Sequence, residues 1–323
     1  MPTDTAPPSD RLAAATLAWL LDADPAIRWQ VLQDLVDAPA DEVAAARARV
    51  ATSGWGRRLL DLQDPDGRWA QALYSPKWTS TTYTLLLLDR LGLRHGHPQA
   101  LRGCEVVWGA ARRYDGGLNL AKTVREPETC ITAMLVRLAV VFGHAPADLD
   151  LTVGWLVAQQ LADGGWNCDT VRTGSQHGSF NTTISVLEAL HLYAASGAVD
   201  VAAAMAAGRD FFLAHRLYRS HRTGAVVDPA MTRFPFPPQW HFDVLRGLEW
   251  FRASGSARDA RLTDAVELVR AARAADGRWR RPAPYPGRTW FVLEPAGPSR
   301  WATLRAARVL RWWDAAPAAG DQG

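Results

Sequence analysis

The sequence has few cysteines and almost no lysine. Its 323 residues include 3 cysteines, Cys104, Cys130 and Cys168, too few for a disulfide framework, so we expect a protein of the reducing cytoplasm. Lysine occurs only at Lys77 and Lys122, and the other basic residues are arginines scattered along the chain. Without basic blocks, and with a formal net charge of only +3, the chain is not expected to bind nucleic acid.

Long apolar runs are missing as well. No uninterrupted apolar run approaches the roughly 20 residues that cross a bilayer, so we expect no transmembrane segment. The N-terminus has neither the basic nor the apolar region of a secretory signal. No sustained alternation of polar and apolar residues occurs, which predicts a fold without a substantial sheet.

What the chain has instead is a repeated turn. The pattern Asp-Gly-x-Trp/Leu occurs at 66–69, 115–118, 163–166 and 276–279, and a degenerate copy can be read at 223–226. A sequence repeat with a period of about 50 residues predicts an array of one small structural unit.

Each turn follows one helical pattern and precedes another. Apolar residues recur at helical spacing in 151–161 and 265–275, directly before two of the turns. We expect the turn glycine to close the last turn of that helix in the left-handed conformation, and the tryptophan to wedge under a neighbouring helix. Second helices follow the turns: four strongly apolar helices are predicted over 84–93, 131–142, 184–193 and 244–251, and an amphipathic fifth over 302–313.

Five such helix pairs predict an all-α fold, an α/α toroid with the more apolar helices inside. Residues 55–323 are expected to form this toroid of five helix-hairpin repeats. Residues 10–54 are predicted as N-terminal helices packed on the barrel, closing the ring or capping one end, with Asp24-Pro25 typical of a helix start. Residues 1–9 are expected to be a disordered tail.

The repeat resembles that of a known superfamily. Leu59–Trp69 and Gln160–Trp166 resemble the Q-W repeat of squalene and oxidosqualene cyclases, which also occurs, in weaker form, in the β-subunits of protein prenyltransferases. Short bacterial prenyltransferase/squalene-oxidase-repeat proteins are similar in more detail, at Asp24–Gln30, Asp163–Asp169, 181–183 and Trp240–Gly247. The resemblance implies an α/α toroid with a central, aromatic-lined cavity.

The motifs that carry the chemistry of these families are missing from this chain. Neither the D-x-D-D acid of class II terpene cyclases nor a D-D-x-x-D diphosphate motif occurs, and the nearest string is Asp148–Leu151. The resemblance implies a terpenoid cyclase-like enzyme, a cyclase, isomerase or transferase. It would bind a hydrophobic small molecule, for which an isoprenoid derivative is one candidate, and use acid or Lewis-acid chemistry. The alternative is a non-catalytic toroid that binds a lipid or a protein.

Candidate site residues gather in the loops after the turns and in the first turns of the inner helices. The expected catalytic residues are Asp243, His241, Asp169 and Glu128. The expected substrate-binding residues are Trp78, Tyr83, Asn181, Trp240, Phe242, Arg300 and Trp301. The proline-rich segments 232–238 and 280–287 are predicted to be ordered rims or lids over this end of the ring.

Several of these residues have a structural interpretation as well. A buried Asp243 with a raised pKa suits a general acid, but an aspartate at a helix start also satisfies backbone donors, and Asp169 has the same two interpretations. Cys130, Cys168 and His241 are a sound zinc set, and related toroids bind zinc with similar ligands. The cysteines also suit packing as small buried residues. The sequence therefore requires no cofactor and leaves zinc as a candidate.

Overall fold

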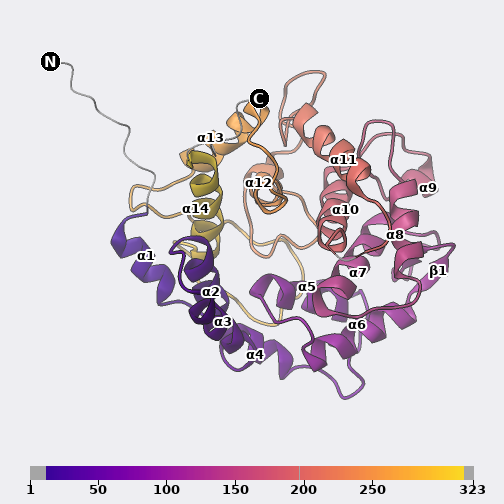
Figure 1. Cartoon of the computed structure of the whole chain (residues 1–323), viewed down its shortest axis with the longest axis horizontal. Coiled ribbons are helices and arrows are strands. Elements are labelled where there is room, and N and C mark those ends of the chain that lie inside the picture. The colour runs from indigo at the N-terminus through magenta and orange to yellow at the C-terminus, as the bar shows by residue number, and fades with distance from the viewer. Residues whose placement is uncertain (1–11, 196, 316–323) are drawn as a thin grey trace.

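A computed structural model describes residues 12–195 and 197–315, and it shows a ring of helices (Figure 1). The tail predicted over residues 1–9 lies outside the described residues. The predicted all-α toroid is confirmed, because the helices form an inner and an outer layer around the ring. Within the described part of the chain, no helix is long and apolar enough to cross a membrane.

The chain forms the ring as a series of helix pairs. The inner helices are α2 (Pro25–Asp34), α5 (Thr81–Leu91), α7 (Thr129–Phe142), α10 (Phe180–Tyr193), α12 (Val244–Ala253) and α14 (Arg300–Asp314). The outer helices are α1 (Ala14–Leu21), α3 (Ala40–Ala48), α4 (Gly54–Leu60), α6 (Pro98–Ala110), α8 (Leu149–Ala158), α11 (Ala202–Ala214) and α13 (Thr263–Ala271). Shorter helical segments are η1 (Arg49–Ala51), α9 (Thr170–Thr173), η2 (Pro229–Thr232) and η3 (Ala260–Leu262). In the described residues, sheet is limited to one antiparallel hairpin, β1 (Arg112–Tyr114) with β2 (Gly117–Asn119).

The repeated glycine does not close the preceding helix, so that prediction is wrong. α4, α8 and α13 each end well before the glycine of their turn. Gly67, Gly164 and Gly277 have φ angles of 89°, 84° and 77°, and each donates its N–H to the carbonyl three residues earlier. This is a separate tight turn after the helix, and its positive φ favours glycine.

The tryptophan after this turn joins the two helices of its repeat. Trp69, Trp166 and Trp279 are buried, and their indole N–H groups donate to backbone carbonyls of the outer helix at 2.7, 2.7 and 2.8 Å. Their backbone N–H groups donate to the hydroxyls of Thr81, Thr183 and Thr303, each of which lies in the first turn of the inner helix of the same repeat. This is the wedge expected from the sequence.

A glutamine ties two of the turns to the next repeat. The side-chain amide of Gln63 donates to the carbonyl of Gly67 at 3.0 Å and to α6 at 2.8 Å. Gln160 makes the equivalent bonds to the carbonyl of Gly164 and to α11, both at 2.8 Å. The Q-W pattern therefore encodes contacts within a repeat and between neighbouring repeats.

The ring closes where α2 meets the last helix, α14. Arg308 of α14 donates to Gln30 of α2 at 2.9 Å and pairs with Asp34 at 3.0 Å. On its other side, α2 is joined to α5, because the indole N–H of Trp29 donates to the carbonyl of Leu91 at 2.9 Å. The helix α2 is therefore an inner helix between α14 and α5.

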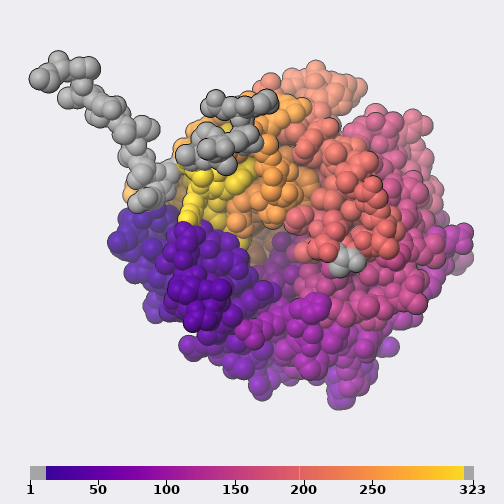
Figure 2. Space-filling model, in the orientation of Figure 1, coloured from indigo at the N-terminus to yellow at the C-terminus, as the bar shows by residue number. Residues whose placement is uncertain are grey.

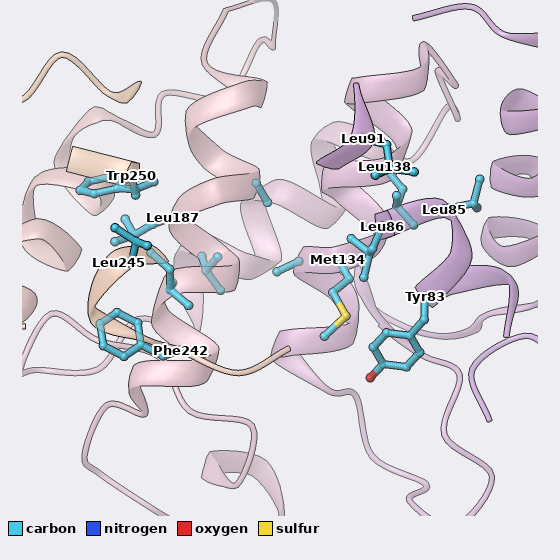
Figure 3. Close-up of a cluster of buried hydrophobic side chains, with 14 of the residues drawn as sticks. Tyr83, Leu85, Leu86, Leu91, Met134, Leu138, Leu187, Phe242, Leu245 and Trp250 are labelled. Carbon is cyan, nitrogen blue, oxygen red and sulfur yellow. The ribbon is translucent and has the colours of Figure 1, made fainter. Parts of the chain in front are cut away.

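Apolar side chains fill the layer between the inner and outer helices. The core runs through all the repeats without a break. Figure 3 draws part of it, with labelled side chains from α5, α7, α10 and α12 and with Phe242, two residues before α12. Burial of these side chains supplies most of the favourable free energy of folding.

Two cover loops, 229–240 and 280–298, close the end of the ring at which the inner helices begin. The second loop reaches across to α5, where the indole N–H of Trp290 donates to the hydroxyl of Thr84 at 3.0 Å. In the first loop, Phe236 stacks on an indole of α14 with 3.8 Å between ring centroids. Both contain the segments predicted as rims, and in Figure 1 the loop before α14 passes through the middle of the ring.

Candidate functional site

A carboxyl and two thiols meet at the start of α7. Glu128 directly precedes the helix, Cys130 lies in its first turn, and Cys168 comes from the loop after the third repeated turn. Their ligand atoms all lie within 4.8 Å of one another. The Cys130 thiol donates to Glu128 at 3.7 Å, and the Cys130 backbone N–H donates to the Cys168 sulfur at 3.2 Å. This Glu–Cys–Cys cluster brings the two predicted cysteine ligands together.

Burial and mutual contact set the acidity of this cluster. Burial raises the pKa of Glu128. The hydrogen bond with Cys168, together with burial, raises the pKa of the Cys130 thiol well above its usual range. A cation placed here would reverse the second effect, since thiols that ligate a metal lose their protons.

His241 does not lie in the Glu–Cys–Cys cluster. Its imidazole is sandwiched between the rings of Trp240 and Tyr285, with 3.7 Å between centroids on either side. Burial and nearby positive charges lower the pKa of His241 to about 4. Among the described residues, the group of side chains that could together hold a metal does not include it. The structure therefore replaces the histidine of the predicted zinc set with a glutamate.

Trp78 and Tyr83 lie between His241 and Tyr74. The ring of Trp78 packs edge-on against Tyr83 at 4.8 Å and approaches His241 at 6.1 Å. The Tyr83 hydroxyl donates to the hydroxyl of Tyr74 at 3.0 Å, and burial raises the pKa of both phenols. Three of the predicted substrate-binding residues, Trp78, Tyr83 and Trp240, thus form one aromatic group around His241.

Asp243 is fully buried at the start of α12. Its Oδ1 accepts the backbone N–H of Arg246 at 2.8 Å and lies 3.5 Å from the guanidinium of Arg305. Its other oxygen, Oδ2, has no hydrogen-bond partner among the described residues. Burial raises the pKa of Asp243, and Arg305 opposes this effect. The carboxyl therefore satisfies a backbone donor, as the structural interpretation requires, and keeps one oxygen free.

Asn181 and Phe242 hold inner helices together. The side-chain oxygen of Asn181 accepts the backbone N–H of Phe242 at 2.7 Å, which joins the start of α10 to the start of α12. Phe242 is buried and stacks on Phe212 of α11 with 5.0 Å between centroids. Both predicted substrate-binding residues thus position the start of α12, which carries Asp243.

Of the remaining predicted residues, Asp169 lies at the surface beside the Glu–Cys–Cys cluster, where it pairs with Arg172 and, in addition to burial, its charge contributes to the raised pKa of Glu128. Arg300 turns toward α1, where its guanidinium lies over the ring of Trp19 and donates to the Trp19 carbonyl at 3.2 Å. Trp301 is buried under the first cover loop. These contacts are those of structural residues, and the structure does not bring the three side chains to one site.

The sequence analysis missed a charged network inside the ring. Glu188 of α10 contacts Arg90 of α5, Arg137 of α7 and Arg246 of α12 at 3.3, 3.0 and 2.7 Å. Because α7 separates α5 from α10, the first of these pairs crosses the interior. A single charge within an apolar helix, such as Glu188 in the predicted helix 184–193, was the available signal.

The network continues along α12 and α14. Glu249 contacts Arg305 and Arg308, both at 2.7 Å, and Arg308 also pairs with Asp34 of α2. Arg252 lies 3.6 Å from the same Asp34. This layer of the interior is lined by charges, whereas the resemblance implied an aromatic lining.

Comparisons with known proteins give limited similarity. No protein-family model matches the chain, and no curated protein matches it. Among solved structures, a protein from Actinoplanes is 18% identical, with 90% of each chain covered and a TM-score of 0.47. The type II terpene cyclase MstE from Scytonema is 15% identical, with 90% of this chain and 88% of that chain covered and a TM-score of 0.44.

A variant of the same cyclase, in complex with its substrate geranylgeranyl dihydroxybenzoate, is 14% identical. It covers 90% of this chain and 86% of that chain, with a TM-score of 0.46. Similarities of this size assign neither a family nor an activity to the chain.

Proposed function

We propose that this protein is a cyclase-like enzyme that protonates a carbon–carbon double bond of a hydrophobic small molecule, with Asp243 as the general acid. The observation that carries the proposal is the buried carboxyl of Asp243, whose Oδ2 has no partner while Oδ1 is held in place. A proton on the free oxygen can be donated without breaking the cap of α12. Burial favours this neutral, proton-donating form of the acid.

The chemical step is balanced without a further reactant. The O–H proton of Asp243 moves to one alkene carbon, and the other carbon becomes a cation. A second double bond of the same molecule then forms a carbon–carbon bond to that cation, and the ring cation loses a proton from carbon. This proton leaves through water, another proton returns to the Asp243 carboxylate, and the product is an isomer of the substrate. Aromatic faces such as those of Trp78 and Trp240 suit a cationic intermediate.

An isotope experiment tests the step directly. Squalene and geranylgeraniol would be incubated with the protein in D₂O, and the products analysed by mass spectrometry. We expect an isomer that carries one deuterium at carbon. Asp243→Asn keeps an oxygen for the α12 cap but has no proton to donate, so the rate should fall by about 10²–10⁴-fold. Asp228→Asn, at an exposed cap of η2, is the matched control and should retain the rate.

An infrared spectrum tests the acid independently of the substrate. A protonated carboxyl has its own carbonyl band, and this band should persist at pH values where ordinary aspartates, with a pKa of about 3.9, are ionised. The part of the band that belongs to Asp243 should vanish in Asp243→Asn. Spectra of the two proteins that coincide over this pH range would rule out Asp243 as a neutral acid.

A Lewis acid at the Glu–Cys–Cys cluster is the second candidate. Two thiols and a carboxyl within 4.8 Å of one another fit a zinc site with three protein ligands and one open position. Glu128, Cys130 and Cys168 would hold the metal, which would polarise an oxygen of the substrate. Tyr74 and Tyr83 would then face the same space as neutral hydroxyl groups.

A zinc site formed by Glu128, Cys130 and Cys168 makes a prediction that differs from the one drawn from the sequence. Protein purified without a histidine tag should carry stoichiometric zinc in native mass spectrometry, and Cys168→Ser and Glu128→Gln should each lose it. His241→Ala should retain zinc, contrary to the set expected from the sequence, and the buried Cys104→Ser is the matched cysteine control. Zinc that persists in Cys168→Ser, or a wild-type protein that takes up none, would remove this candidate.

A further inference from the structure

The charged network inside the ring has more positive than negative groups. Its contacts join six arginines to five carboxyl groups, one of which, Asp243, is the proposed neutral acid. The arginines are Arg90, Arg137, Arg246, Arg252, Arg305 and Arg308. The carboxyl groups are Asp34, Asp89, Glu188, Asp243 and Glu249. A surplus charge that is largely removed from water is costly unless a counter-charge accompanies it.

The surplus is concentrated around Glu188, because three guanidinium groups share its carboxylate. Arg137 has a second acid, Asp89, at 2.6 Å. Arg246 also donates to the carbonyl of His241. Arg90 reaches Glu188 only through Nη2, at 3.3 Å from both oxygens, and its side chain makes no other hydrogen bond within the described residues. Burial and the neighbouring arginines lower the pKa of Arg90 to about 10.

A second pair of arginines has N–H donors without acceptors. Arg252 and Arg308 both contact the same oxygen of Asp34, at 3.6 and 3.0 Å. The Nε–H groups of both arginines have no acceptor among the described residues. The network therefore lacks acceptor oxygens as well as negative charge.

The network is more exposed to solvent at the end of the ring away from the cover loops. Near the cover loops, the side chains of Arg305 and Asp243 are 2% and 0% exposed. Farther along the inner helices, Arg90 and Arg252 are 16% and 28% exposed. The ring interior is therefore open at the end away from the cover loops, and the face seen in Figure 2 is hollowed near its centre.

We propose that this open end of the ring interior binds a phosphate-type oxyanion, as free phosphate or diphosphate or as the phosphoryl group of a small molecule, held by Arg90, Arg252 and Arg308. The anion supplies both the missing negative charge and the missing acceptors. Guanidinium groups present paired N–H donors that match the oxygens of phosphate, which a halide ion cannot match.

Titration with pyrophosphate tests the site. At low ionic strength, pyrophosphate should bind the full-length protein in isothermal calorimetry and raise its melting temperature. Sodium chloride at equal ionic strength should do neither, since screening alone would act equally with both salts. Arg90→Gln should weaken pyrophosphate binding by about tenfold or more, the scale of one charge-assisted hydrogen bond, and Arg252→Gln should act in the same way.

The controls separate this site from general charge effects and from the proposed acid. Arg57→Gln removes an arginine from an exposed pair with Asp61 and should leave pyrophosphate binding unchanged. Asp243→Asn should also keep pyrophosphate binding, so the test of the oxyanion site is independent of catalysis by Asp243. No heat of binding to the wild-type protein, or an equal loss in Arg57→Gln, would overturn the proposal. Melting of each variant without ligand checks that it is folded.

Discussion

Replacing Glu188 with glutamine should lower the free energy of unfolding by about 3–5 kcal/mol, the usual cost of removing one partner from a buried ion pair. The variant keeps the size of the side chain but leaves Arg90, Arg137 and Arg246 facing one another without their shared carboxylate. Chemical denaturation at neutral pH measures the difference. Glu267→Gln, which removes an exposed pair with Arg270, should change the free energy by less than about 1 kcal/mol.

The pH dependence of this difference follows from the sign of the pKa shift. Three arginines hold the pKa of Glu188 well below its usual range, so its contribution is complete above the unfolded pKa of about 4.3. It is lost as the pH falls through the folded pKa. The gap between the wild-type protein and Glu188→Gln should therefore be widest near neutral pH and narrow in strong acid. A second substitution, Arg90→Gln, should recover part of the loss, and a gap that does not depend on pH would contradict the ionic explanation.

Replacing Trp166 with alanine should cost about 3–5 kcal/mol of stability, as expected when a large buried aromatic side chain is truncated. The indole fills the space between α8 and α10 and donates to the carbonyl of Leu156. Trp69→Ala should behave in the same way, since its indole makes the equivalent bond in its own repeat. Thermal melting and chemical denaturation measure both variants.

Two further variants separate packing from hydrogen bonding in this repeat. Trp166→Phe keeps most of the buried area but loses the indole N–H and part of the ring. The lost hydrogen bond should lower the free energy of unfolding by about 1 kcal/mol, in addition to the cost of the lost volume. Trp240→Ala is the matched tryptophan control, because Trp240 is half-buried beside His241 and should cost clearly less than Trp166→Ala. Equal destabilisation by the two alanine variants would contradict the assignment of Trp166 as the residue that holds its repeat together.

The toroid could be predicted from the sequence because the residues that specify each helix pair are close together in the chain and recur in every repeat. Each copy of the turn carries its own glycine, three of the four clear copies carry a tryptophan, and the spacing of about 50 residues, counted with the degenerate copy at 223–226, leaves little room for another architecture. The exact role of the glycine could not be predicted, since a helix that ends before Gly164 and one that ends at it have the same residue pattern. Helix propensity does not distinguish the two, and the hydrogen bonds of the turn decide between them.

The site could be predicted only in part because its geometry depends on contacts between repeats. Cys130 and Cys168 meet because the loop after one turn reaches the start of the inner helix of the preceding repeat, and the order of the repeats indicates that these two segments are neighbours. The stacking of His241 against Tyr285 depends on how a cover loop folds back, and no pattern in the sequence encodes that path. The partners of Glu188 come from three different inner helices, so the sequence shows the charges but not their pairing.

The closure of the ring through α2 has a consequence for self-association. An open array of helix pairs needs terminal repeats with a polar outer face, because its last helices would otherwise expose apolar flanks. A ring has no such ends, and here α2 covers one flank of α14 and one flank of α5. A chain that lost its first helices would expose both flanks to water. The flanks of a second copy would be the most complementary surface available to cover them, so we expect a chain without its N-terminal helices to polymerise through its own repeat.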